Sequence, residues 1–368
     1  MDLNLLNKNR REFLKTGLSM GAAALFTTSS ARAAGFGAYP GMPAAPQPSA
    51  APAAAPSRVA LTNGDSRTDN IFRALKSLEK EIAQSIGNRR VIIKPNNVST
   101  SNQLASTHAD ALIGILEFLK SIGKLDNAII AESTAMGSAM QGFENFGYIK
   151  VAEKYKVELV DIDQSEYITI MGFNQSDARP YPVRVSSMLT NQRDNFIISA
   201  CMLKTHDRAV ATMSIKNIVF GAPLKLQTPG SRGFANDKAI LHGGGAHGIS
   251  INLAMLTPLL HPSLAVIDGF EGMEGRGPIG GTRVDHRVCV VSTDYLAADT
   301  VGAHLMGIDP MDIGYLNYLA STNVGQTDLS KMEILGEPVE KLAKKYNLGD
   351  SIERQLEWKT PAKVTFAT

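Results

Sequence analysis

Two lysines and a histidine follow one apolar segment near the middle of the sequence. Lys204 and His206 come directly after that segment, and Lys216 starts the next helix-like stretch. Ammonium and imidazole groups that share a cleft suit a phosphate or carboxylate, because they donate hydrogen bonds to anionic oxygens. We therefore predict Lys204, His206 and Lys216 as catalytic residues that hold and polarise an anionic substrate. If this motif is considered alone, the alternative interpretation is preferred, in which Lys204 and Lys216 are solvated and His206 caps a helix.

Other apolar segments also end in polar residues. In an open parallel sheet the carboxyl ends of the strands meet at one edge, where ligands bind. We expect Ser106 or Thr107 to cap the helix near Ala111, which leaves His108 free to face a ligand. Further polar strand ends occur at 161–163 and 292–294. The predicted substrate-binding residues are Lys94, Asn96, His108, Glu132 and Asn217.

Two glycine-rich segments contain residues that bind metals. One carries two carboxylates, which are ligands for a hard divalent cation, and the other carries two histidines, which suit a transition metal. Glycines in such segments allow a close approach of the backbone to a ligand. In the alternative interpretation the acids pair with Arg276 or Arg283. The predicted ligands of a divalent metal are Asp268, Glu274, His242 and His247.

The elements that must position these residues alternate between strand and helix. Short β-rich runs are separated by segments with helical periodicity, which predicts an α/β fold with a doubly wound, mostly parallel sheet. A strand-rich middle segment and a long Gly-rich loop at 223–248 interrupt the pattern. The predicted strands are 59–62, 91–94, 128–131, 157–161, 167–170, 182–185, 196–200, 264–268 and 288–292. The predicted helices are 70–86, 112–123, 146–155, 249–256, 297–306 and 311–320.

The N-terminal region has the order of a secretory signal. Arg10 and Arg11 precede a short apolar stretch and a small-residue cleavage site, which predicts a twin-arginine signal peptide at 1–33. An Ala/Pro-rich tether is predicted at 34–57, the α/β domain at 58–336, and a C-terminal helix and tail at 337–368. We expect export by the twin-arginine machinery to the periplasm or another extracytoplasmic place.

The composition limits the classes of partner that the protein is expected to bind. The 368 residues carry a net charge of +2, without a basic run, which argues against nucleic-acid binding. No apolar segment is long enough for stable membrane insertion. Cys201 and Cys289 lie in strand-like runs and are expected as buried thiols, although a disulfide between them stays open at this point.

The ordered motifs resemble a widespread prokaryotic family catalogued as domain of unknown function 362. The resemblance spans about residues 58–336 and implies no agreed reaction. Some members resemble redox proteins with ferredoxin-type cysteine clusters, but this chain lacks those cysteines, so no iron–sulfur cluster is expected. The matching motifs are Lys94–Asn96, Ser106–His108, Glu132–Ser133, Phe143–Tyr148, Lys204–His206, Ser214–Asn217, Met273–Pro278, Ser292–Asp294, Ala298–Asp299 and Met306–Pro310.

These observations predict an exported, metal-assisted enzyme that acts on a small anionic substrate at the carboxyl edge of its sheet. The reaction class stays open between hydrolysis, isomerisation and a redox-associated step. The alternative is a non-catalytic periplasmic binding module or an accessory partner of a redox enzyme.

Overall fold

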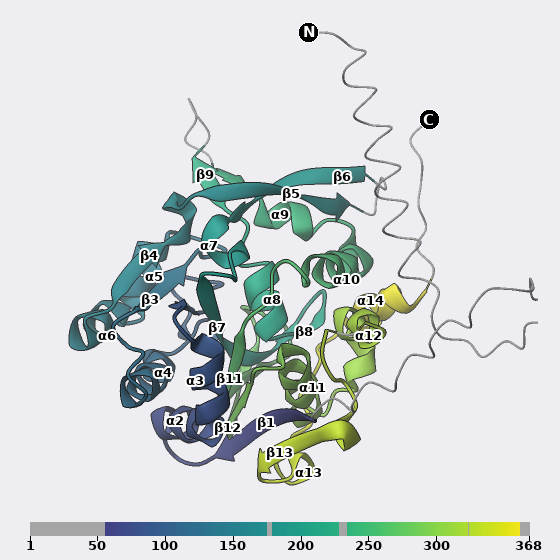
Figure 1. The fold of residues 1–368 in the computed structure, drawn as a ribbon. Coiled ribbons are helices and arrows are strands. Elements are labelled where there is room, and N and C mark those ends of the chain that lie inside the picture. Colours follow the sequence, from purple (N-terminus) through teal and green to yellow (C-terminus); the bar gives the residue numbers. More distant parts are fainter. Residues whose placement is uncertain (1–55, 175–178, 228–233, 323, 361–368) are drawn as a thin grey trace, which may run out of the picture. The chain divides into compact units, whose positions relative to one another are not determined.

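A nine-stranded sheet forms the centre of the described part of the chain, and Figure 1 shows helices on both of its faces. The computed structural model describes residues 56–174, 179–227, 234–322 and 324–360. The predicted signal peptide and nearly all of the predicted tether lie outside these residues. The strands of the sheet are β1 (Ser57–Asn63), β2 (Arg90–Lys94), β3 (Ala128–Glu132), β4 (Glu158–Asp161), β7 (Asn195–His206), β8 (Val210–Thr212), β11 (Leu264–Glu274), β12 (Thr282–Ser292) and β13 (Met332–Gly336).

The strand order is β13-β1-β12-β11-β7-β2-β3-β4, with β8 paired to β7. Neighbours from β11 through β7, β2 and β3 to β4 run parallel. β12 runs antiparallel to both β1 and β11. The predicted mostly parallel sheet is thus confirmed. Because β12 is reversed, its carboxyl end lies at the opposite edge of the sheet, and Asp294 there caps a helix instead of facing the crevice.

Side chains that alternate along each strand fill two separate cores, as a doubly wound sheet requires. Ile92 belongs to one core, and its neighbours Val91 and Ile93 belong to the other. The α-helices are α2 (Arg67–Ser77), α3 (Glu79–Ile86), α4 (Ala109–Ser121), α5 (Ala139–Asn145), α6 (Tyr148–Tyr155), α7 (Ser187–Thr190), α8 (Ser214–Val219), α9 (Lys238–Leu241), α10 (Gly245–Leu256), α11 (Tyr295–Leu305), α12 (Gly314–Ala320), α13 (Val339–Leu342) and α14 (Ile352–Gln355). The 3₁₀ helices are η1 (Gln103–Ala105), η2 (Ile162–Gln164), η3 (Pro310–Asp312), η4 (Leu329–Lys331) and η5 (Leu356–Lys359).

The two cysteines are buried free thiols on opposite faces of the sheet. Cys201 belongs to the same core as Ile92, whereas Cys289 belongs to the core of Val91 and Ile93. This arrangement answers the question that the sequence left open, because a disulfide needs Cβ atoms about 4 Å apart with converging bonds. Burial also raises the pKa of both thiols.

The strand-rich middle segment forms a hairpin, and the structure shows that this hairpin is separate from the main sheet. Its strands β5 (Tyr167–Asn174) and β6 (Arg179–Ser186) pair antiparallel and lie beside α9 and α10 (Figure 1). The stretch at 223–248, predicted as a loop, instead holds a second hairpin, β9 (Lys225–Gln227) with β10 (Phe234–Asn236), followed by α9. The glycines of this stretch mask any strand or helix pattern in the sequence, so these short elements were not predicted. Tertiary contacts stabilise them.

Several element boundaries differ from the sequence prediction. The helix expected at 70–86 is two helices that meet at Leu78, and the expected C-terminal helix is the two short helices α13 and α14. β7 is longer than predicted and includes Lys204–His206, because this end pairs with the short strand β8. Within the described residues, no helix has the length and apolarity needed to cross a bilayer.

Candidate functional site

A small pocket lies where β2, β3 and β7 end and α8 begins. Its volume is about 80 Å³, far below the ~300–1,000 Å³ of sites for drug-sized ligands. Three lysines, two histidines and one carboxylate are among the described residues that line it, so a small anion fits its charge and size. The principal lining residues are Lys94, Asn96, Asn97, Glu132, Ser133, His206, Lys216, Asn217, Phe220, Gly221, Lys238 and His242.

One wall of the pocket is a saturated polar network around Lys94. This lysine is 1% exposed, and its Nζ donates to Glu132 Oε1 at 2.6 Å, Pro95 O at 3.0 Å and Asn217 Oδ1 at 3.3 Å. Glu132 also accepts hydrogen bonds from the backbone N–H groups of Asn97 and Ser133. Every donor of the Lys94 ammonium therefore has an acceptor, and its charge is balanced by a carboxylate.

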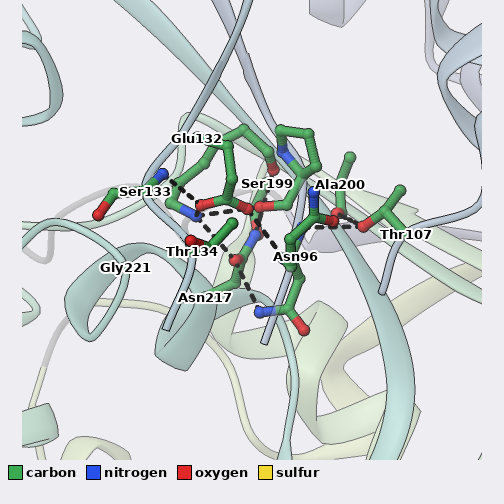
Figure 2. A network of polar contacts seen from close by, with 12 residues as sticks. Asn96, Thr107, Glu132, Ser133, Thr134, Ser199, Ala200, Asn217 and Gly221 are labelled. Carbon is green, nitrogen blue, oxygen red and sulfur yellow. Dashed lines mark hydrogen bonds and ion pairs between the residues drawn. The ribbon is translucent and has the colours of Figure 1, made fainter. Parts of the chain in front are cut away.

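Amide side chains extend this network across the strand ends. Figure 2 shows Asn96, Glu132 and Asn217 converging, with Ser199 on the adjacent strand. Asn217 Nδ2 donates to Ser199 Oγ at 3.0 Å, and Asn96 Nδ2 donates to Asn217 Oδ1 at 3.1 Å. Gly221 allows this crowding, because a Cβ at that position would lie 2.4 Å from the Cε atom of Lys94. The network fixes four of the five side chains predicted as substrate-binding, namely Lys94, Asn96, Glu132 and Asn217.

Lys204 lies behind this wall and is not among the residues that line the pocket. It is fully buried on β7, and its Nζ donates to Asn96 Oδ1 at 2.6 Å and to Ala105 O at 3.0 Å. Burial lowers the pKa of Lys204 to about 7. This predicted catalytic residue is therefore connected to the pocket by its hydrogen bond to Asn96, which lines it.

Lys216 differs from its neighbours, because its ammonium makes no hydrogen bond or ion pair with the described residues. It is 8% exposed and lines the pocket, with Nζ 5.0 Å from the centre of the Phe220 ring. Burial lowers the pKa of Lys216 to about 8. The ammonium of this largely buried side chain therefore has donors that an anionic oxygen of a ligand could use.

The short helix α8 holds Lys216 in place. Asp299 on α11 is fully buried and accepts hydrogen bonds from Ser214 N at 2.8 Å, Ser214 Oγ at 2.5 Å and Ile215 N at 3.2 Å. Burial raises the pKa of Asp299 to about 6. Asp299 was not predicted to have a role in the site. Its only signal was its place in a family motif.

His206 and His242 line the pocket as two neutral imidazoles, with the proton on Nε2 in His206 and on Nδ1 in His242. The ring centroids are 6.4 Å apart, and burial lowers the pKa of both imidazoles, to about 3 for His242. The Arg208 N–H donates to His206 Nδ1 at 3.0 Å, so His206 carries its proton on Nε2. His242 Nδ1 is 2.7 Å from Lys238 O, a carbonyl that can only accept, so His242 Nε2 is unprotonated. One imidazole therefore offers a donor and the other an acceptor.

Lys238 was not predicted as part of the site, and Ser133 was noted only within the Glu132–Ser133 motif. Lys238 is buried on α9, and its Nζ donates to Ser133 Oγ at 2.8 Å, Gly221 O at 3.2 Å and Pro223 O. Burial lowers its pKa to about 7. Lys238 precedes His242 by one helical turn, a spacing that would have indicated a shared face had α9 been recognised.

Four predicted site residues lie elsewhere. His108 is partly exposed and is itself the N-cap of α4, accepting from Asp110 N at 3.1 Å, which corrects the expected capping by Ser106 or Thr107. Asp268 forms a buried ion pair with Arg67, with Oδ2 2.9 Å from Nε. Burial raises the pKa of Asp268 to about 6.

The remaining two predicted metal ligands are also engaged in other contacts. Glu274 Oε2 accepts from Asn347 N at 2.8 Å, and His247 Nε2 lies 2.7 Å from Thr360 O. Of the predicted ligands, His242 alone lines the pocket. Among the residues that the structure describes, no three His, Cys, Asp or Glu side chains are grouped to hold a metal ion. The four predicted ligands are therefore not brought together, and metal binding itself stays a prediction.

The fold and this site define an α/β protein with a buried, lysine-rich pocket at the carboxyl edge of a doubly wound sheet. The family described as "Domain of unknown function (DUF362)" matches residues 91–304, and the chain belongs to that family. The match includes every described residue that lines the pocket.

A curated relative comes from Synechocystis sp. (strain ATCC 27184 / PCC 6803 / Kazusa). It is "Thylakoid-associated protein sll1697", which is 25% identical over 230 residues. The aligned region covers 61% of this chain and 65% of the relative.

Proposed function

We propose that this protein is an acid–base enzyme that binds a small anionic substrate, through a phosphate or carboxylate group, in the pocket of Lys216, His206 and His242. The observation that carries the proposal is that Lys216, a largely buried side chain that lines the pocket, has no hydrogen-bond acceptor for its ammonium among the described residues. An anionic oxygen would supply that acceptor and compensate the cost of burial.

The charge of the pocket favours an anion over a cation. Glu132 is already balanced by Lys94, whereas Lys216 and Lys238 have no carboxylate within hydrogen-bonding distance among the described residues. At 4 Å, two unit charges interact by about 4 kcal/mol at an effective dielectric constant of 20, so two unbalanced ammonium groups strongly affect the choice of ligand.

Proton transfer is the chemistry that the two histidines support. Both are neutral near pH 7, and one presents Nε2–H while the other presents an unprotonated Nε2. A fixed donor and a fixed acceptor beside one anion site suit general acid–base catalysis, which contributes typically 10²–10⁴-fold. Among the reaction classes expected from the sequence, this pair of groups best supports a hydrolase or an isomerase. Because a twin-arginine signal peptide is predicted, we also propose that the protein acts outside the cytoplasm.

Calorimetric titration of the full chain with inorganic phosphate and with oxalate tests the binding step. We expect saturable binding near pH 7 that weakens about 10-fold to 100-fold in Lys216→Met, since a hydrogen bond to a charged group contributes about 1.5–3 kcal/mol. Wild-type protein that binds neither anion would contradict the proposal.

The alternative is a non-catalytic binding module for the same anion. Hydrogen–deuterium exchange at carbon atoms beside the carboxylates of small acids separates the two functions. An enzyme accelerates exchange in proportion to its concentration, and the His242→Ala variant loses this acceleration. Saturable binding without any exchange or turnover would favour the binding module.

A further inference from the structure

Four buried lysines lie at or near the pocket, of which Lys94 is paired with Glu132, and the other three differ in what their amino groups contact. Lys204 donates to two oxygens and Lys238 to three, so their Nζ atoms are directed by hydrogen bonds. Lys216 has no such partner among the described residues, and its Nζ faces the pocket over the Phe220 ring. Only Lys216 can therefore turn a lone pair toward a ligand without breaking an existing contact.

We propose that Lys216 is a nucleophile that forms an imine with the carbonyl carbon of a small 2-oxo acid. This inference rests on the proposed function, because the same pocket must first bind the carboxylate of that acid. It names the substrate class and a covalent step that anion binding alone does not require.

The neighbouring groups supply what imine formation needs. Attack requires an uncharged amine, and burial brings the pKa of Lys216 to about 8, so a useful fraction is uncharged near neutral pH. His206 donates Nε2–H to the carbonyl oxygen and draws electron density from the carbon. His242 Nε2 is free to accept protons from the attacking nitrogen.

The step balances without an oxidant or reductant. Nζ forms a bond to the carbonyl carbon, and the π electron pair of the carbonyl moves to oxygen. His242 carries one proton from nitrogen to that oxygen and then a second one. The oxygen leaves as water while the nitrogen lone pair completes the C=N bond.

The geometry limits the size of the substrate. A pocket of about 80 Å³ holds a group of only a few heavy atoms. Lys238 and Lys216 line the pocket without a carboxylate ion-pair partner among the described residues, so they would attract the acid group of the substrate. Two-carbon and three-carbon 2-oxo acids are therefore the appropriate probes.

Borohydride trapping tests the proposal. The full chain is incubated with glyoxylate or pyruvate near pH 7.5, reduced with sodium cyanoborohydride, and mapped by peptide mass spectrometry. We expect the secondary-amine adduct at Lys216 to form at least tenfold faster than at the exposed Lys150. Inorganic phosphate should slow the Lys216 adduct and leave the Lys150 adduct unchanged.

Lys216→Arg is the matched control. Arginine is not a nucleophile, so the adduct at residue 216 should be lost while the adduct at the exposed Lys150 forms at the wild-type rate. If this variant does not fold, the slower formation of the Lys216 adduct in wild-type protein when phosphate is present still tests the assignment. Labelling at Lys204 or Lys238, or at Lys216 no faster than at Lys150, would overturn the imine while phosphate binding keeps the proposed function. Loss of phosphate binding by wild-type protein would overturn both.

Discussion

Lys94 and Lys216 are two buried lysines that line one pocket, and they differ in what surrounds their charge. Lys94 has three acceptors, one of them the carboxylate of Glu132. Lys216 has none among the described residues, although it is nearly as buried. A buried charge that is fully paired belongs to the folded framework, whereas one left unpaired indicates a place for a ligand. The same residue type at the same sheet edge therefore has two different roles.

The largest expected effect is on stability, at the paired lysine. Lys94→Met leaves the Glu132 carboxylate buried without its cation, which costs about 3–5 kcal/mol in comparable pairs. We expect the free energy of unfolding to fall by about that amount in urea titrations followed by circular dichroism. The Lys94→Met/Glu132→Gln double variant should recover part of the loss, because glutamine removes the buried charge.

The second effect is on binding, at the unpaired lysine. We expect Lys216→Met to raise the free energy of unfolding at pH 7 above that of wild type, because no hydrogen bond of the described residues is lost and the cost of burying the ammonium is removed. Calorimetry should show that the same variant loses phosphate affinity, as described above. The comparison between the two lysines fails if Lys216→Met destabilises the protein as much as Lys94→Met.

The third effect is the pH dependence of stability. Burial lowers the pKa values of Lys204, Lys216 and Lys238 to about 7, 8 and 7, against ~10.4 in an unfolded chain. Between these values the unfolded chain binds more protons, so stability rises with pH. The destabilisation by these lysines is complete below about pH 7 and is relieved above it. Cys201 and Cys289 act in the opposite direction above about pH 8.5, since burial raises their pKa.

We therefore expect the free energy of unfolding to increase from about pH 7 to about pH 8.5, with a smaller slope in Lys216→Met. Phosphate affinity should fall over the same interval, because Lys216 loses its proton. Urea titrations and calorimetry at matched pH values measure the two trends. Parallel trends in stability and affinity would contradict the assignment of Lys216 to the anion site.

The smallest effect is expected outside the pocket. Glu274→Gln keeps the acceptor for Asn347 N and should leave both phosphate affinity and stability within about 0.5 kcal/mol of wild type. Plasma mass spectrometry of both proteins tests the predicted metal site at the same time. A stoichiometric metal that is lost in the variant would make Glu274 a ligand, and the pocket would then not be the main site.

Much of the fold follows from patterns that are local in the sequence. Apolar runs such as the one at 128–131 and the helical periodicity around 112–119 predict elements correctly, because each must bury one face or both. Short elements such as β9 and α9 lack such a pattern and form because they pack on the rest of the protein. The reversal of β12 was not predicted, since strand direction depends on pairing partners far away in the chain.

Candidate residues of the site were predicted to the extent that they follow strands. Asn96, Glu132 and Asn217 converge as predicted, because parallel strands end at one edge. Lys238 was missed, and Asp268 was paired with Arg67, a partner far away in the chain. Residue type alone says nothing about such long-range pairings.

The sequence by itself determined the alternation of strands and helices, the family motifs and the basic character of the strand ends, because these depend on residue types at short spacing. Only the tertiary structure decided that Lys94 is paired and Lys216 is not, and that His206 and His242 present opposite proton positions. The physical reason is that hydrogen-bond satisfaction and pKa values depend on burial and on neighbours that the chain brings together only when it folds.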